Sequence, residues 1–270
     1  MKKSLARFML PPDLPLEAIF PKIKAMGYDG IQLLLGADKG DVRLGMSDAE
    51  LKAILAMAGK AGIEIHSLLP SGLGRFIDPD PAARKKTVDE FKQGLAIARK
   101  MGIHVMLVHP GQINEQAPYD AAYDWVKTSF EKLVSTAEKT RCCLAIENVW
   151  NKFLLSPLEM RDFVDGFKSQ AIRVYFDVGN IILYGFAEQW VRILGKRIAE
   201  VHFKDFRRAA GTGAGFVPLL AGDVNWPAVM KELKAIGYDG YVCAELGGYA
   251  HAPDQALRDA VTAMDAILAM

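Results

Sequence analysis

The chain has 270 residues, and its 33 Lys and Arg against 32 Asp and Glu leave a formal net charge of +1. Hydrophobic residues make up 51% and charged residues 24%, a profile that predicts a globular protein with a substantial core and excludes a disordered chain. The balanced charge disfavours nucleic acid as a partner, and no apolar run reaches the about 18 residues that a membrane span needs. We therefore expect a soluble, cytoplasmic protein with no membrane partner.

Junctions of helix, glycine and strand recur along the chain. Residues 24–30 read Lys-Ala-Met-Gly-Tyr-Asp-Gly and residues 234–240 read Lys-Ala-Ile-Gly-Tyr-Asp-Gly, while Gly62 and Gly102 follow similar amphipathic stretches. Such a glycine ends a helix in the left-handed conformation that other residues adopt only with strain. The pattern indicates a repeated βα unit.

Eight runs of apolar residues are predicted to be strands. In chain order they are Ala6–Leu10, Ile31–Leu35, Ile63–Leu69, His104–His109, Cys142–Val149, Ile172–Asp177, Ala199–Phe203 and Tyr241–Leu246. Helical patterns lie between them, and Ser47, Ser156 and Asn225 precede three of these as candidate caps. The predicted helices are Asp48–Gly59, Ala82–Met101, Ala121–Lys139, Pro157–Phe167, Ala187–Leu194, Trp226–Ile236 and Gln255–Leu268.

This alternation predicts an α/β fold with parallel strands, and eight units in 270 residues fit a (β/α)8 TIM barrel in a single domain over residues 1–270. A doubly wound sheet is the alternative, but no strand is followed by the Gly-x-Gly-x-x-Gly pattern of dinucleotide-binding sheets. Residues 211–215, Gly-Thr-Gly-Ala-Gly, are interpreted as a flexible surface loop after the seventh strand. The three cysteines, Cys142, Cys143 and Cys243, fall in apolar runs and suit reduced core thiols.

Four consecutive predicted strands end in a side chain that can bind a metal: Glu147, Asp177, His202 and Glu245. Successive members are separated by about one βα unit, so a barrel would place them around one half of its functional rim. A single carboxylate at a strand end is unremarkable, but three carboxylates buried together need a compensating cation. Three carboxylates and one imidazole suit one divalent metal ion such as Mn²⁺, Mg²⁺, Co²⁺ or Zn²⁺.

The sequence resembles the xylose isomerase-like barrels, the superfamily of sugar isomerases and epimerases. The resemblance covers the whole chain and is most specific at residues 146–160, 175–180, 201–205 and 222–226, which look like the subgroup labelled sugar-phosphate isomerase/epimerase or hexulose-6-phosphate isomerase. It implies that Glu147, Asp177, His202 and Glu245 form the metal shell and that Glu147 and Glu245 also act as the acid/base pair. Two positions depart from the family pattern: Asn180 stands where ketose 3-epimerases carry a histidine, and Gln32 where an acid is common.

Further residues at the predicted rim are candidates for binding substrate. His66 and His109 are placed at the ends of the third and fourth strands and either bind sugar hydroxyls or are structural. Trp150 either stacks on a sugar face or packs within its loop, and the amide of Asn180 can hydrogen-bond a hydroxyl. Lys204, Arg207 and Arg208 either bind a phosphate or enediolate oxygen, or form a solvated basic loop.

The chemistry of a ketose fits this set of residues. Isomerising or epimerising a ketose removes a proton from the carbon beside the carbonyl, and a divalent cation stabilises the resulting enediolate while one carboxylate takes the proton and another returns it. We therefore predict a metal-dependent isomerase or epimerase of a small ketose or ketose phosphate. A dehydratase of a keto-inositol, an endonuclease IV-like repair protein and a non-catalytic sugar-binding protein are the alternatives, and a homo-oligomer is left open.

Overall fold

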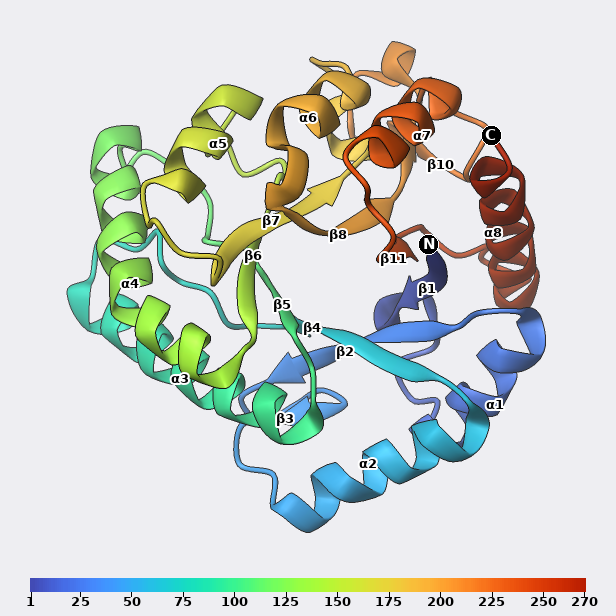
Figure 1. Ribbon diagram of the computed structural model, residues 1–270, viewed down its shortest axis with the longest axis horizontal. Helices are drawn as coiled ribbons and strands as arrows, with labels where there is room; N and C mark the ends of the chain where they lie inside the picture. The colour runs from blue at the N-terminus through green and yellow to red at the C-terminus, as the bar shows by residue number, and fades with distance from the viewer.

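In the computed structural model, which describes residues 1–270, eight parallel strands close into a barrel surrounded by eight helices (Figure 1). The ring closes because β1 pairs with both β2 and β11, the second and last strands of the barrel. This confirms the predicted (β/α)8 barrel. The barrel strands are β1 (Lys2–Ala6), β2 (Gly30–Gly36), β4 (Glu64–Pro70), β5 (Val105–Val108), β6 (Cys143–Glu147), β7 (Ile172–Asp177), β8 (Ile198–Phe203) and β11 (Tyr241–Ala244).

The helices begin and end largely where the sequence predicts. The side chains of Ser47, Ser156 and Asn225 accept hydrogen bonds from the backbone three residues on, so all three are N-caps. Gly27 and Gly62 end their helices with φ of +100° and +69°, as the recurring junction requires. The helices are α1 (Leu16–Met26), α2 (Asp48–Ala61), α3 (Pro81–Met101), α4 (Tyr119–Thr140), α5 (Pro157–Asp165), α6 (Ala187–Leu194), α7 (Trp226–Ala235) and α8 (Pro253–Leu268).

Alternation along the strands divides the side chains between two cores. Residues such as Leu33, Leu144 and Phe176 face outward into the main core between strands and helices. The intervening residues face the barrel interior, where a smaller apolar cluster comprises Leu69, Val105, Leu107, Cys143, Ala145 and Tyr175. All three cysteines are buried and free, as the sequence predicts.

The first predicted strand is wrong in position. The sequence predicts Ala6–Leu10, but the strand is Lys2–Ala6, and a 3₁₀ turn over Arg7–Met9 follows it. The cause is the buried Arg7, whose guanidinium donates to the carbonyls of Pro11 and Leu14 and pairs with Asp41 at 2.8 Å. These contacts fold the chain back immediately after β1.

Short strands and a 3₁₀ turn lie at the carboxyl ends of the barrel strands. β3 (Val42–Arg43) extends the sheet beside β2, and β9 (Asp205–Phe206) pairs antiparallel with β10 (Phe216–Val217). The glycine-rich segment 211–215 forms the tip of this β9–β10 hairpin, where it makes a 3₁₀ turn over Gly213–Gly215. Residues 211–214 are exposed and Gly215 is buried, so the predicted loop lies at the surface as a hairpin tip.

No helix of the chain combines the length and hydropathy needed to cross a bilayer.

Candidate metal centre

Four side chains meet inside the carboxyl end of the barrel. Glu147 ends β6, Asp177 ends β7, His202 is the next-to-last residue of β8, and Glu245 directly follows β11. Each follows an inward-facing residue by two positions, for example Ala145 before Glu147, so strand alternation directs all four side chains into the barrel. All four are buried, and one potential ligand atom from each lies within 4.8 Å of the others.

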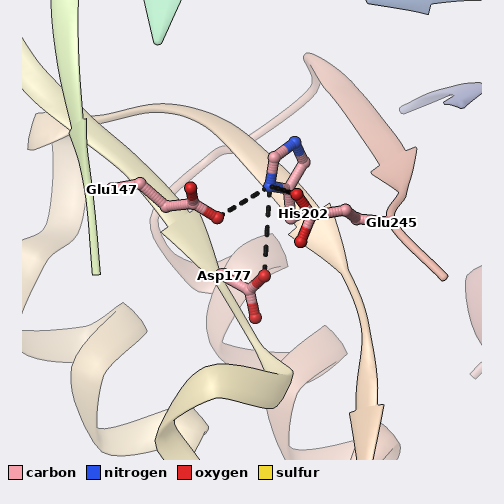
Figure 2. Close-up of side chains that lie close together, drawn as sticks. All are labelled: Glu147, Asp177, His202 and Glu245. Atoms are coloured by element: carbon pink, nitrogen blue, oxygen red, sulfur yellow. Dashed lines mark hydrogen bonds and ion pairs between the residues drawn. The ribbon is translucent and has the colours of Figure 1, made fainter. Parts of the chain in front are cut away.

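The ring nitrogen Nδ1 of His202 faces the three carboxylates (Figure 2). It lies 2.9 Å from Glu147 Oε1, 3.6 Å from Glu245 Oε1 and 3.9 Å from Asp177 Oδ2. Burial alone would lower the pKa of His202, but the carboxylates of Glu245 and Glu147 outweigh it and hold this pKa well above 6.5. Without a metal, the cluster is therefore held together by a protonated imidazole.

Oδ2 of Asp177 has no hydrogen-bond donor in the cluster, and the nearest cationic atom, Nζ of Lys204, lies 3.5 Å away. This oxygen is buried, and burial, reinforced by the charges of Glu245 and Glu147, raises the pKa of Asp177 from 3.8 to about 8. A buried acceptor without a donor is costly. A cation among three carboxylate oxygens and one imidazole nitrogen would supply the missing partner, so the residues fit a divalent metal ion.

Each glutamate divides its two oxygens between the cluster and a basic side chain. Oε1 of Glu147 faces His202, whereas its Oε2 is hydrogen-bonded to Nε2 of His109. Oε1 of Glu245 likewise faces His202, whereas its Oε2 accepts from Nζ of Lys204. One oxygen of each glutamate is thus directed toward a potential metal position and the other toward a potential proton donor.

The structure places His109 and Lys204 at the cluster. His109 immediately follows β5, and its side chain is 40% exposed, so it lies at the border between the cluster and solvent. Lys204 also lies 3.5 Å from Asp177 Oδ2, and its ammonium sits over the ring of Phe216 at 4.7 Å. Burial would lower the pKa of Lys204, but Asp177 and Glu245 raise it above its ordinary value, which keeps the ammonium charged.

Trp150 and Asn180 lie in loops beside the cluster, and their polar side-chain groups are hydrogen-bonded to the backbone. The indole of Trp150 donates to the carbonyl of Asn180 at 2.8 Å and packs against the rings of Phe206 and Phe216. The amide of Asn180 donates to the carbonyl of Asn148 at 3.0 Å, and its backbone N–H donates to Asp177 Oδ1 at 2.8 Å. Asn180 thus orients Asp177, and its amide nitrogen is not turned toward an open site.

The placement of His66 at the rim is wrong. His66 is the third residue of β4, and the strand continues through Pro70. It lies where the register between β2 and β4 shifts by one residue, an irregularity that hydrophobic periodicity does not reveal. Its buried ring pairs with Glu200 at 2.8 Å and stacks on Tyr241, the first residue of β11, toward the opposite end of the barrel.

Arg207 and Arg208 make no ion pair or hydrogen bond with the cluster. Arg207 donates to the carbonyl of Ala221 at 2.8 Å, and Arg208 donates to the carbonyl of Ile182 at 2.9 Å while covering the ring of Phe186. Both therefore tie together loops at the carboxyl ends of the strands.

Asn148 and Asp205 support the site but were not singled out from the sequence, although both belong to the segments that carry the resemblance. The side chain of Asn148 forms two hydrogen bonds with the backbone of Asp177: its amide donates to the Asp177 carbonyl at 2.7 Å, and its Oδ1 accepts from the Asp177 N–H at 2.9 Å. The buried carboxylate of Asp205 accepts from the indole of Trp226 at 3.1 Å and from the backbone N–H of Leu220 at 2.9 Å. Asn148 directly follows Glu147 and Asp205 directly follows Lys204, and these positions were the only sequence signal that could have indicated their supporting roles.

Comparison with known proteins agrees with this architecture. The sequence profile of the xylose isomerase-like TIM barrel family matches residues 20–267. The chain belongs to this family. Among curated proteins, it is 26% identical over 240 residues to the Escherichia coli K12 protein named "Putative L-ribulose-5-phosphate 3-epimerase SgbU", with 83% of this chain and 80% of the relative covered.

Solved structures share the family's fold with this chain. D-psicose 3-epimerase from Clostridium cellulolyticum H10, solved with D-tagatose, superposes with a TM-score of 0.83 and 17% identity over 99% of both chains. The 3-keto-D-glucoside 4-epimerase YcjR from E. coli superposes with a TM-score of 0.82 and 16% identity over 98% of this chain and 99% of YcjR. At these identities the likeness establishes the fold of the whole chain.

Proposed function

We propose that this protein is a metal-dependent epimerase or isomerase that acts at the carbon beside the carbonyl of a small ketose or ketose phosphate. The observation that carries the proposal is the division of oxygens in Glu147 and Glu245, each with Oε1 toward the cluster and Oε2 toward a basic side chain. Family membership and the names of the relatives support it, since those names describe epimerases of ribulose 5-phosphate, psicose and a 3-keto-glucoside.

Glu147, Asp177, His202 and Glu245 would hold one divalent ion, with Mn²⁺, Mg²⁺, Co²⁺ and Zn²⁺ as the candidates. When bound, such an ion supplies Lewis acidity that stabilises negative charge on the carbonyl oxygen. The protein then needs a base to take the proton and an acid to return it, and both groups must stay in place through the reaction.

The two glutamates meet this need. One of them takes the proton from the carbon beside the carbonyl, and the electron pair of the broken C–H bond forms the enediolate. The other returns a proton to the opposite face in an epimerisation, or to the neighbouring carbon in an isomerisation. His109 and Lys204, bound to the outer oxygens, would orient the carboxylates, and the ammonium of Lys204 adds positive charge where the enediolate develops.

The test is a product screen of the metal-reconstituted protein against ketoses, ketose phosphates and inososes in deuterated water. We expect deuterium at the carbon beside the carbonyl and a new epimer or isomer. Glu147→Gln and Glu245→Gln should each abolish turnover and labelling, whereas Glu64→Gln, a control at the opposite end of the barrel, should retain them. Release of water from an inosose would identify a dehydratase instead, and normal turnover in either active-site variant would contradict the two-carboxylate mechanism.

A further inference from the structure

A buried amide lies behind His202, on the side of the ring away from the carboxylates. Gln32 of β2 places Oε1 3.2 Å from His202 Nε2, and its Nε2 donates to Ser67 Oγ of β4 at 3.1 Å. Gln32, Ser67 and His202 are all completely buried. A buried amide is tolerated only when it is hydrogen-bonded, so these contacts fix the position of Gln32.

The orientation of this amide decides which nitrogen of His202 keeps its hydrogen when the ring becomes neutral. A carbonyl oxygen only accepts, so Nε2 of His202 must donate to Gln32 Oε1. In this arrangement the amide NH₂ donates to Ser67, and the carbonyl is turned toward the ring. Because Nε2 keeps its hydrogen, the ring becomes neutral by losing the Nδ1 proton, which leaves the lone pair of Nδ1 for a cation among the three carboxylates.

We propose that Gln32, oriented by Ser67, is a positioning residue that fixes the ring and the Nε2–H form of His202 so that Nδ1 is presented to the metal. The inference rests on the proposed metal site and adds to it two residues of β2 and β4, strands that contribute no ligand. Because Gln32 is neutral, it orients His202 without adding a fourth negative charge to Glu147, Asp177 and Glu245.

Isothermal titration of the metal-free protein with Mn²⁺ tests the proposal. Gln32→Met keeps the volume and removes the acceptor, so we expect affinity to fall about 10- to 100-fold, as for other residues that orient metal-bound histidines. Gln32→Glu restores an acceptor and should bind Mn²⁺ at least as tightly as wild type. Ser67→Ala should weaken binding, whereas Ser4→Ala, an equally buried serine of β1 that bonds only the Val242 carbonyl, should not.

A second readout separates this inference from the metal site itself. In metal-free protein labelled with ¹⁵N-histidine, the Nε2–H proton of the protonated His202 ring should exchange slowly with solvent, and this protection should be lost in Gln32→Met and retained in Gln32→Glu. If wild type bound no metal, the proposed function would fail while this signal still tested the role of Gln32.

Three results would overturn the inference. The first is wild-type affinity together with an unchanged Nε2–H signal in Gln32→Met. The second is an equal loss of affinity in Gln32→Met and Gln32→Glu, which would indicate packing alone. If Gln32→Met does not fold, the third is a Ser67→Ala affinity equal to that of Ser4→Ala.

Discussion

Replacing Asp177 by asparagine should stabilise the metal-free protein at neutral and alkaline pH. The carboxyl titrates near 3.8 when unfolded but at about 8 in the barrel, because burial and the charges of Glu245 and Glu147 oppose its ionisation. Below pH 3.8 the group is protonated in both states and has no effect. Between pH 3.8 and 8 the folded state binds more protons than the unfolded state, so stability falls as pH rises.

The size of this effect follows from the two pKa values. Their separation corresponds to at most about 6 kcal/mol once the pH exceeds 8, and relaxation around the buried charge reduces such penalties. We therefore expect Asp177→Asn to raise the free energy of unfolding by about 2–4 kcal/mol at pH 8, which is the part of the penalty that remains after the protein relaxes around the buried charge. The gain should be smaller at pH 6.

Urea denaturation of EDTA-treated wild type and Asp177→Asn at pH 6, 7 and 8 measures the effect. Asp165→Asn is a control of opposite sign, because the hydrogen bond with Arg197 lowers the pKa of Asp165 and makes its ionised form stabilising. Excess Mn²⁺ should stabilise wild type but not Asp177→Asn. An Asp177→Asn protein that is less stable than wild type at every pH would refute the reasoning.

Two further substitutions test the surroundings of the cluster. Lys204→Met removes the ammonium that donates to Glu245, so Mn²⁺ affinity measured by calorimetry should stay the same or increase. The kcat should fall about 100-fold, as expected when a donor to a developing oxyanion is lost. A wild-type kcat would contradict this role. Gly179→Ala places a Cβ 2.8 Å from the backbone of Lys204, so it should cost about 1–3 kcal/mol in thermal unfolding and reduce turnover. Gly213→Ala meets no atom within 4 Å and should do neither, and equal effects of the two alanines would rule out the steric explanation.

The sequence was sufficient for the parts of the fold that depend on local patterns. Glycine at helix ends and apolar runs located the barrel strands, and alternation then brought Glu147, Asp177, His202 and Glu245 together. Helix α1 was not among the predicted helices, although the junction at Gly27 indicated its end, since Pro21 interrupts the helical pattern; Pro21 is nevertheless accommodated within the helix.

The remaining features depend on contacts between distant segments. The turn after β1 is set by Arg7 and Asp41, which no local propensity connects. His66 was placed at a strand end although the predicted strand Ile63–Leu69 and β4 both continue beyond it. Its pairing with Glu200, 134 residues away in the chain, is a contact that no local pattern predicts. Gln32 was noticed only as a departure from the family pattern, since its role depends on its distance to His202, which is 170 residues away in the chain.

Substrate charge is the other property that local pattern left open, and the basic loop gives it a structural test. Arg207 and Arg208 each bind a backbone carbonyl through one nitrogen, at Ala221 and Ile182, and a guanidinium has further N–H donors. The loop lies after β8, the seventh strand of the barrel ring, and loops at this place in TIM barrels frequently bind phosphate. A phosphorylated ketose would use the free donors without breaking the bonds that hold the loops.

If the substrate is phosphorylated, the double variant Arg207→Ala/Arg208→Ala should raise KM for a ketose phosphate far more than for the matching free ketose. Each charge-assisted hydrogen bond lost is worth about 1.5–3 kcal/mol, so removing one such contact should raise KM about 10- to 100-fold. Arg99→Ala is the matched control, because Arg99 also donates to a backbone carbonyl, that of Lys139, at the opposite end of the barrel. Steady-state kinetics with both sugars measure the difference. Equal increases in KM for the two sugars would mean that the arginines only hold the loops, and a wild-type preference for the free ketose would show that the loop does not recognise phosphate.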